Sequence, residues 1–378
     1  MKQLYIGPEI HQFDTFKDFA EEFTLCASDL ILTNEYIYKP FIEKLELPCG
    51  RIYQEKFGLG EPTDTMTQAI LDEAAKGNYD RVIAIGGGTV IDIAKVLVLG
   101  GGATVDELYG NMVGLTKARR LIIIPTTCGT GSEVTNISIL NRTRLGTKQG
   151  LVSPAMFADH AVLIPEFLQS LPYSVFATSS IDALIHAVES YLSPSATPYT
   201  EMYSLQAMQD ILRGYCQIAE RGQHARFQSS AEYLRASNYA GIAFSNSGCA
   251  AVHAMSYALG GKYHVAHGES NYQFFTDVLR KYQEKKPDGK IRTLDHFLQN
   301  TIAAAGSGAE LEGDTGIDLL ECLLSRVLER KRMADYGVTR EDIPVFAQST
   351  IDNQQRLLKN NYVPLTLEDI TAIYQARL

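Results

Sequence analysis

The sequence predicts an α/β domain with a parallel sheet over residues 1–172, followed by an all-helical domain over residues 173–378. In the first part, short apolar segments alternate with amphipathic stretches, which is typical of a parallel sheet covered by helices on both faces. After about residue 170 no further strand-like segments occur, and long stretches with helical character follow one another.

The elements expected in the first domain follow from these patterns. Three runs of consecutive apolar residues predict buried strands over 29–33, 81–87 and 120–125. The stretch 65–77 is amphipathic and ends in glycine, so it predicts a helix, and the apolar stretch 89–100 predicts a second one. In the second domain, helices are expected within 177–192, 200–221, 230–244 and 249–261, and in a C-terminal helix capped by Thr366.

Composition narrows the possible functions. The chain has 378 residues, 45% of them hydrophobic, and a formal net charge of −10, so we expect a globular protein that binds neither nucleic acid nor an anionic membrane surface. The apolar runs are too short to span a bilayer, and the N-terminus lacks the apolar region of a signal peptide, so a cytoplasmic location is expected. The six cysteines form no CxxC pair and are interpreted as reduced thiols, with Cys128 and Cys249 as small apolar filler.

One carboxylate and three imidazoles are candidates for a single metal site. Asp182 and His186 are four residues apart, and therefore share one face of a helix. With His253 and His267 they make a ligand set for iron(II) or zinc. His253 and His267 would lie roughly 21 Å apart in one unbroken helix, so the chain must reverse between them, and Gly260-Gly261 is the expected place.

A lone buried histidine is more often a core residue than a ligand, which is the alternative for each of these three. Four of the other five histidines are interpreted as structural or surface residues: His11, His160, His224 and His296.

Two glycine-rich turns predict a nucleotide site. Gly86, Gly87, Gly88 and Thr89 follow a predicted strand and open a helix, where backbone N–H groups favour a phosphate. A tight turn needed only for packing is the alternative. In the same helix, Asp92 could help to orient a ligand, and Lys95 is expected to be structural or exposed.

The second turn, 125–133, also follows a predicted strand and offers Thr126, Thr127 and Thr130 as donors. Thr130 and Glu133 have the spacing of a capping box. Since both turns stand at the carboxyl ends of parallel strands, one nucleotide is expected to lie across that edge of the sheet.

Four motifs together resemble the iron-containing (group III) alcohol dehydrogenase family, of the dehydroquinate synthase-like superfamily: GGGTVIDIAK (86–95), PTTCGTGSEVT (125–135), DALIHAVESY (182–191) and HGESN (267–271). The resemblance covers essentially the whole chain. It implies a dinucleotide across the two turns and a divalent metal, Fe²⁺ with Zn²⁺ left open, on the four candidate ligands. It adds five residues to the expected cofactor site: Asn34, Gly60, Glu61, Pro62 and Lys148.

The chain departs from the family pattern at two positions that bear on function. The family often has an aspartate where Asn34 stands, and that carboxylate would repel the 2′-phosphate of NADP. NAD is expected here, with NADP left open. Tyr257 stands where many relatives have a histidine, one helical turn after the third metal ligand. Tyr257 and His264 are therefore the candidates for a proton relay, with packing or support of the ligands as the alternative.

Within the family, segments 159–172, 179–204, 237–244 and 259–275 are most similar to members that interconvert 4-hydroxybutyrate and succinate semialdehyde. Lys262, His264 and Tyr257 are candidates for binding the substrate carboxylate. A dehydrogenase of propanediol, glycerol or a simple alcohol is the main alternative. A lyase is disfavoured because residues 182–203 contain no Lys or Arg and 248–271 only Lys262. A nucleotide-binding module without catalysis would leave the metal ligands unexplained. The family suggests a homodimer or larger oligomer, with a small-molecule substrate as the other partner.

Overall fold

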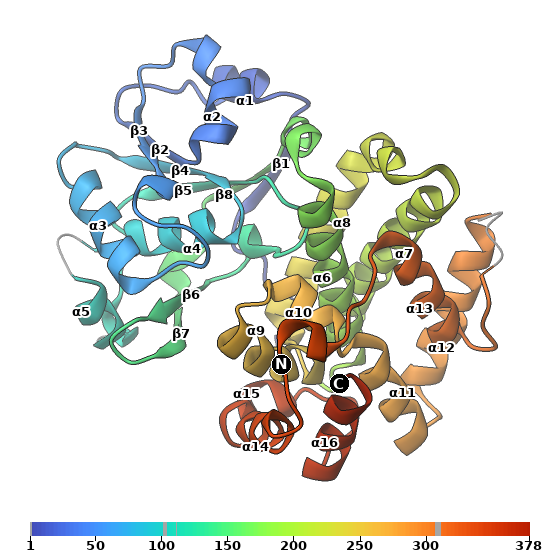
Figure 1. Ribbon diagram of the computed structural model, residues 1–378. Coiled ribbons are helices and arrows are strands. Elements are labelled where there is room, and N and C mark those ends of the chain that lie inside the picture. Colours follow the sequence, from blue (N-terminus) through green and yellow to red (C-terminus); the bar gives the residue numbers. More distant parts are fainter. Residues whose placement is uncertain (1, 101–103, 111, 307–310) are drawn as a thin grey trace. The chain divides into compact units, whose positions relative to one another are not determined.

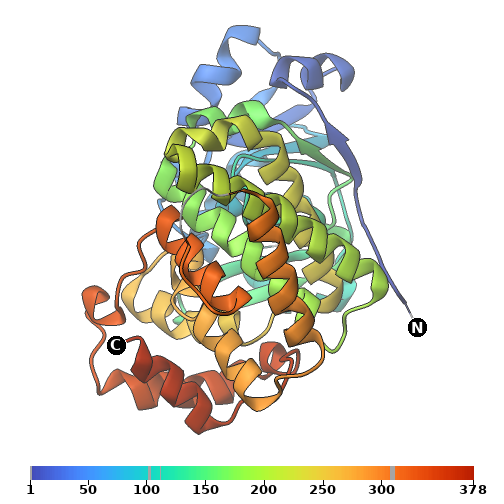
Figure 2. The same cartoon turned by 90° about the vertical axis from the view of Figure 1, so that its right-hand side faces the viewer.

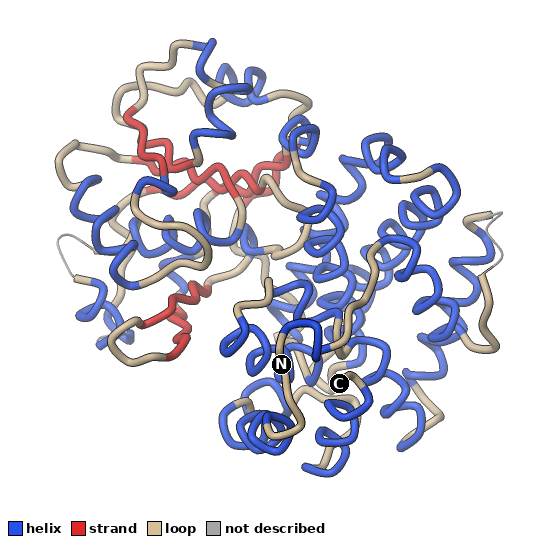
Figure 3. The backbone as a smooth tube through the Cα atoms, viewed as in Figure 1, coloured by secondary structure: helices blue, strands red, loops and turns tan. Residues whose placement is uncertain are grey.

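The computed structural model describes residues 2–100, 104–110, 112–306 and 311–378, which form two compact units (Figure 1). The α/β unit comprises Ile6–Leu171, and the helical unit comprises Pro172–Leu378 together with the N-terminal residues up to Tyr5. The predicted fold class, an α/β part followed by an all-helical part, is confirmed. All strands of the described chain lie in the α/β unit (Figure 3).

The α/β unit is built on a six-stranded parallel sheet with the order β1-β8-β5-β4-β2-β3. Its strands are β1 (Glu9–Gln12), β2 (Asp29–Thr33), β3 (Gly50–Tyr53), β4 (Arg81–Gly86), β5 (Arg120–Pro125) and β8 (His160–Leu163). The three expected strands are confirmed as β2, β4 and β5. An antiparallel hairpin of β6 (Ile137–Arg142) and β7 (Thr147–Val152) is added to the unit.

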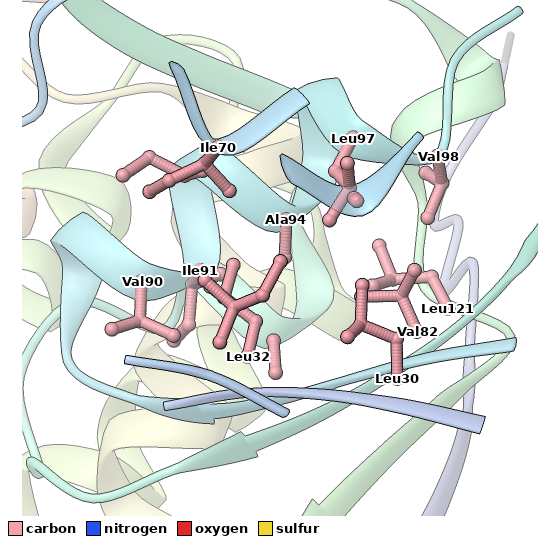
Figure 4. Close-up of a cluster of buried hydrophobic side chains, with 14 of the residues drawn as sticks. Leu30, Leu32, Ile70, Val82, Val90, Ile91, Ala94, Leu97, Val98 and Leu121 are labelled. Carbon is pink, nitrogen blue, oxygen red and sulfur yellow. The ribbon is translucent and has the colours of Figure 1, made fainter. Parts of the chain in front are cut away.

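Apolar side chains on both faces hold this sheet between helices. Its helices are α1 (Phe16–Glu22), α2 (Glu35–Phe41), α3 (Asp64–Ala74), α4 (Gly88–Leu97) and α5 (Val105–Gly110). One face of β2, β4 and β5 packs against α3 and α4 through residues such as Leu32, Val82 and Ile91 (Figure 4). The other face packs against α1 and α2. Because consecutive residues of a strand point to opposite faces, the interior positions of the central strands are all apolar.

The helical unit contains α6 (Tyr173–Leu192), α7 (Pro198–Arg221), α8 (Ser230–Ser247), α9 (Ala251–Tyr263), α10 (His267–Tyr272), α11 (Phe275–Lys285), α12 (Lys290–Ala304), α13 (Gly316–Val327), α14 (Asp342–Asn353), α15 (Gln355–Leu358) and α16 (Leu367–Ala376). The helices α6, α7 and α8 pack on one another, and α14–α16 lie at one end of the unit (Figure 2). Thr366 caps α16, as expected. Among the described residues, no helix combines the length and apolar character needed to cross a bilayer.

Helix α6 is the central element of this unit. Every residue from Ser180 to Leu192 is buried, including Asp182, His186 and Glu189. A buried polar group that lacks a hydrogen-bonding or ionic partner destabilises the fold. The polar side chains of α6 must therefore be matched by groups on the helices around them.

Lys95 is buried inside the α/β unit, which settles its predicted role as structural. Its ammonium group donates to Ser132 Oγ at 2.7 Å, to Thr135 Oγ1 at 2.8 Å and to the Ile137 carbonyl at 2.8 Å. The Asp92 carboxylate is 4.0 Å away. Burial lowers the pKa of Lys95 to about 8. The side chain thus braces α4 against the segment that leads from β5 into β6.

We expect Lys95→Met to lower the free energy of unfolding by about 3 kcal/mol, because Asp92 and three acceptors would lose their buried cation. Urea unfolding followed by circular dichroism measures the change. Lys76→Met is the matched control, since Lys76 is exposed and its pair with Glu73 contributes little. Equal stability of the two variants would contradict the bracing role.

Candidate metal centre and nucleotide loops

The four predicted metal ligands come from three helices of the helical unit and converge. His253 Nε2 on α9 lies 3.0 Å from His186 Nε2 and 3.6 Å from Asp182 Oδ1 on α6. His267 Nε2, at the first position of α10, lies 3.9 Å from the same Asp182 oxygen. Ligand atoms of a tetrahedral zinc or iron site are separated by about 3.4 Å when the bonds are about 2.1 Å long. The arrangement is therefore suited to one divalent cation.

Glu189 sets the orientation of the His253 ring. Its Oε2 lies 2.6 Å from His253 Nδ1, and its two oxygens also accept hydrogen bonds from the N–H groups of Ala250 and Val252. Burial alone would lower the pKa of His253, but the neighbouring Cys249 and Glu189 raise it well above its ordinary value. Glu189 accepts the Nδ1 proton, so a cation that displaces the other proton of the ring would bind at Nε2.

Asn271 on α10 orients the carboxylate. Its Nδ2 donates to Asp182 Oδ1 at 2.7 Å and lies 3.2 Å from His267 Nε2. Burial would raise the pKa of Asp182, but the imidazoles of His186 and His267 outweigh it and hold the pKa well below its usual range. Asp182 is thus an anion at neutral pH, which is the form that binds metal.

The chain reverses between His253 and His267, but not where the sequence predicted. Gly260 and Gly261 lie inside α9, which continues to Tyr263. The reversal is at His264, which has a left-handed backbone with φ of 55° and whose N–H donates to the Gly260 carbonyl. Val265 is buried directly afterwards. Burial of that side chain and the closing hydrogen bond outweigh the modest strain of a left-handed histidine, while glycine in a helix costs only about 1 kcal/mol.

Gly268 allows α10 to approach α6 closely. A Cβ at this position would lie 2.2 Å from the Thr178 carbonyl oxygen and 3.3 Å from Asp182 Cβ. No side chain fits there, because real Cβ contacts are never so short. The glycine therefore brings the neighbouring His267 to the carboxylate of α6.

Sequence reasoning missed Glu189, Asn271 and Cys249. Helical spacing contained a signal for the first two, since Glu189 is three residues after His186 and Asn271 is four after His267. Cys249 Sγ lies within 4.8 Å of ring nitrogens of both His186 and His253, so its interpretation as filler is incomplete. Burial raises the pKa of the Cys249 thiol, and the neighbouring His253 acts in the opposite direction.

The residues predicted to relay a proton or to bind the substrate carboxylate have different surroundings. Tyr257 is half-buried in an apolar cluster that includes Cys249 and Leu357. His264 is exposed at the reversal. Lys262 is paired with the Asp342 carboxylate, which also accepts from the Tyr263 hydroxyl at 2.6 Å. The roles of Tyr257 and His264 stay predictions, and Lys262 is engaged with another residue.

In the α/β unit, the two predicted nucleotide turns lie side by side. Gly86 ends β4 and Gly87 is the N-cap of α4, so N–H groups of the first turn of α4 stand at the carboxyl edge of the sheet. A Cβ on Gly87 would lie 3.5 Å from Thr127 Cγ2, and one on Gly88 would lie 3.4 Å from Thr130 Cγ2. The two turns therefore form one continuous surface.

The segment around Gly60 joins the same edge. Thr89 Oγ1 donates to the Gly60 carbonyl at 3.0 Å, and Lys148 Nζ donates to Glu61 Oε1 at 2.7 Å. The carbonyl of Pro62 accepts from the N–H of Asn141 at 2.8 Å. These contacts gather the predicted cofactor residues of this segment beside α4 and the hairpin.

One expectation about this region is wrong, and the contacts of Asp92 are now defined. Thr130 and Glu133 do not form a capping box, because only a short 3₁₀ turn over Ser132–Val134 follows, and Thr130 Oγ1 accepts instead from the Ser132 N–H at 3.3 Å. Asp92 holds the loop, since its carboxylate accepts from Ser132 Oγ at 3.1 Å and from the Ile139 N–H at 3.0 Å. The role of Asp92 in orienting a ligand stays a prediction.

We expect Gly268→Ala to push α10 away from α6 and to weaken metal retention at least tenfold, because His267 and Asn271 would lose register with Asp182. Metal content after dialysis against a graded series of chelator concentrations measures the effect. Gly261→Ala is the control, because no atom lies within 4 Å of a Cβ built there. Equal metal retention in both variants would show that the close approach is unimportant.

Comparison with known proteins agrees with this geometry. The family described as "Iron-containing alcohol dehydrogenase" matches residues 8–165, and "Fe-containing alcohol dehydrogenase family, C-terminal" matches residues 176–378. The chain is 48% identical over 375 residues to 4-hydroxybutyrate dehydrogenase of Clostridium kluyveri, covering 99% of each chain. It is 32% identical to long-chain-alcohol dehydrogenase 1 of Geobacillus thermodenitrificans, covering 92% of this chain and 88% of that one.

Solved structures share the fold. Sulfoacetaldehyde reductase from Bifidobacterium kashiwanohense, crystallised in complex with NAD⁺, superposes with a TM-score of 0.84 at 22% identity, covering 100% of this chain and 99% of that one. Both halves of the chain thus match the same enzyme family, and the full-length relatives have the same organisation. The chain belongs to the iron-containing alcohol dehydrogenase family and is an oxidoreductase that acts on CH–OH groups.

Proposed function

We propose that this enzyme interconverts 4-hydroxybutyrate and succinate semialdehyde with NAD as the hydride carrier. The observation that carries the proposal is the likeness to the Clostridium kluyveri enzyme, which extends over almost the full length of both chains. The convergence of an anionic carboxylate and three imidazoles supports it, because a metal-assisted alcohol dehydrogenase needs such a set. The homodimer suggested by the family stays a prediction.

The helical unit supplies the metal ligands in this proposal. A divalent cation held by Asp182, His186, His253 and His267 supplies Lewis-acid polarisation of the substrate oxygen. Iron is proposed from the family, and zinc accepts the same nitrogen and oxygen donors. Glu189 keeps the proton of His253 on Nδ1, and Asn271 holds the Asp182 oxygen in place. These two residues fix the donor atoms before a cation binds.

The α/β unit supplies the dinucleotide site. The N–H groups at the start of α4 and the hydroxyls of Thr126, Thr127 and Thr130 are suited to the pyrophosphate. Lys148 and the segment around Gly60 line the same edge of the sheet. Hydride transfer to or from the substrate carbon is chemistry that the nicotinamide supplies when bound.

A carboxylate at the carboxyl end of β2 favours NAD over NADP. Asn34 Nδ2 donates to Glu55 Oε2 at 3.0 Å and to Gln54 Oε1 at 3.1 Å. Glu55 Oε1 accepts from the Glu35 N–H at 2.6 Å, so this carboxylate is held from two sides. Glu55 therefore supplies the negative charge that an aspartate at position 34 carries in many members of the family. A 2′-phosphate beside it would be repelled.

The main alternative substrate class is a simple alcohol or diol, as the name of the Geobacillus thermodenitrificans relative illustrates. A lyase reaction is disfavoured further by the structure, because Lys262, the one cation of residues 248–271, is paired with Asp342. The substrate test below separates hydroxy acid from diol chemistry.

With NADH, we expect kcat/KM for succinate semialdehyde to exceed that for 3-hydroxypropanal at least tenfold. His267→Ala should lower kcat about a hundredfold or more and release the metal, because it removes one ligand and the polarisation that depends on the cation. Steady-state rates and metal analysis of the same samples test both points. His296→Ala, an exposed residue of α12, is the control. Full activity of His267→Ala would refute the metal centre, and a preference for 3-hydroxypropanal would refute only the substrate.

We expect the wild-type enzyme to bind NADH more tightly than NADPH, and Glu55→Gln to reduce that preference about tenfold, which corresponds to about 1.4 kcal/mol. The amide removes the charge but keeps an acceptor for Asn34 and Glu35. Titration of nicotinamide fluorescence gives both dissociation constants without turnover. Glu35→Gln is the matched control, since its carboxylate is paired with Lys39. If Glu55→Gln left the ratio of the NADH and NADPH dissociation constants unchanged, a group other than Glu55 would determine the preference for NADH.

A further inference from the structure

A second cluster of metal-binding side chains lies in the α/β unit, at the edge of its sheet. Glu9 and His11 are two apart on β1, so they share one side of that strand. His160 begins β8 and stands directly opposite Glu9 in the parallel pairing. The three side chains therefore project together from the outermost pair of strands.

The donor atoms of this cluster form a nearly equilateral triangle. His11 Nε2 is 3.1 Å from His160 Nδ1, and Glu9 Oε2 is 3.5 Å from the former and 3.3 Å from the latter. One face of a tetrahedron with bonds of about 2.1 Å has edges of about 3.4 Å. A cation could thus reach all three atoms at normal bond lengths with little movement of the side chains.

The surroundings suit a cation that keeps a fourth position open. The Phe23 ring packs edge-on against both imidazoles, with centroid distances of 5.3 Å to His11 and 5.1 Å to His160. The Glu9 side chain is 74% exposed, so water has access to the site. Burial and the neighbouring His11 lower the pKa of His160, which favours the neutral, ligating form.

Two further charged residues, Arg81 and Asp159, lie near His160, and each is paired with an opposite charge. Arg81 disfavours a cation there, but Asp29 binds its guanidinium through both carboxylate oxygens at 2.7 Å and offsets its charge. Asp159, next to His160 in the chain, attracts a cation, although it is shared with Lys117 at 3.0 Å. The local field therefore does not oppose a divalent ion.

We propose that Glu9, His11 and His160 form a second binding site for a divalent transition-metal ion such as Zn²⁺, with water as the remaining ligand. Two imidazoles and one carboxylate are a common zinc ligand set. The ion would join β1 to β8 through side chains and so secure the edge strand of the sheet. This site is independent of the centre on α6, because it shares no residue with it.

The test is zinc stoichiometry of the full-length, tag-free protein after equilibrium dialysis against buffered Zn²⁺. We expect two ions per wild-type chain and one per chain in Glu9→Gln and in His160→Gln. Glu9→Gln is the decisive variant, because an exposed side chain can be exchanged without affecting folding. His224→Gln and His296→Gln, exposed histidines elsewhere, should keep both ions.

A further variant separates this proposal from the catalytic one. His267→Ala should lose the ion of the helical unit and keep the ion on β1 and β8. One ion in the wild type that disappears in His267→Ala would overturn the second site and leave the catalytic centre standing. A second ion that persists in both Glu9→Gln and His160→Gln would also overturn the assignment.

Discussion

The charged groups on α6 are enclosed by protein on all sides, and this burial determines how the helical unit is organised. Asp182, His186 and Glu189 occupy one face of a helix that is buried from Ser180 onward. Leaving them without partners would cost several kcal/mol each. The fold satisfies them through α9 and α10, which present imidazoles, backbone N–H groups and an amide. The same matching of charges that stabilises the unit also brings together the donor atoms of the proposed cation site.

The convergence of the ligands could be predicted from spacing, but the path of the chain between them could not. A distance argument required a reversal between His253 and His267. The reversal takes place at His264 because Val265 is buried and because Gly260 packs close to the Val265 carbonyl. A Cβ built on Gly260 would lie 3.4 Å from that carbonyl oxygen. Hydrophobic periodicity describes each segment by itself, so it does not predict these contacts between segments. Glycine pairs indicate where a helix can end, while tertiary packing decides whether it does.

In the α/β unit, the buried strands β2, β4 and β5 were predictable because both of their faces are covered. The edge strands β1 and β3 were missed, since they are short and largely polar and so lack an apolar pattern. Glu55 shows a second limit of sequence reasoning. It lies 21 residues after Asn34, yet hydrogen bonding brings the two side chains together. A charge absent from one position of a motif was supplied from the neighbouring strand connection.

The contacts of Lys95 affect how the proposed coenzyme site of this chain can be re-engineered. Its ammonium group and the Asp92 carboxylate connect α4 to Ser132, Thr135 and the start of the hairpin. The two loops proposed to bind phosphate are consequently ordered by the protein itself, so binding of a ligand would not require their ordering. Replacing one loop alone with that of a relative would mismatch it with the residues that it contacts in this chain. A chimaera that changes coenzyme affinity should therefore exchange both loops together with α4 as a single module.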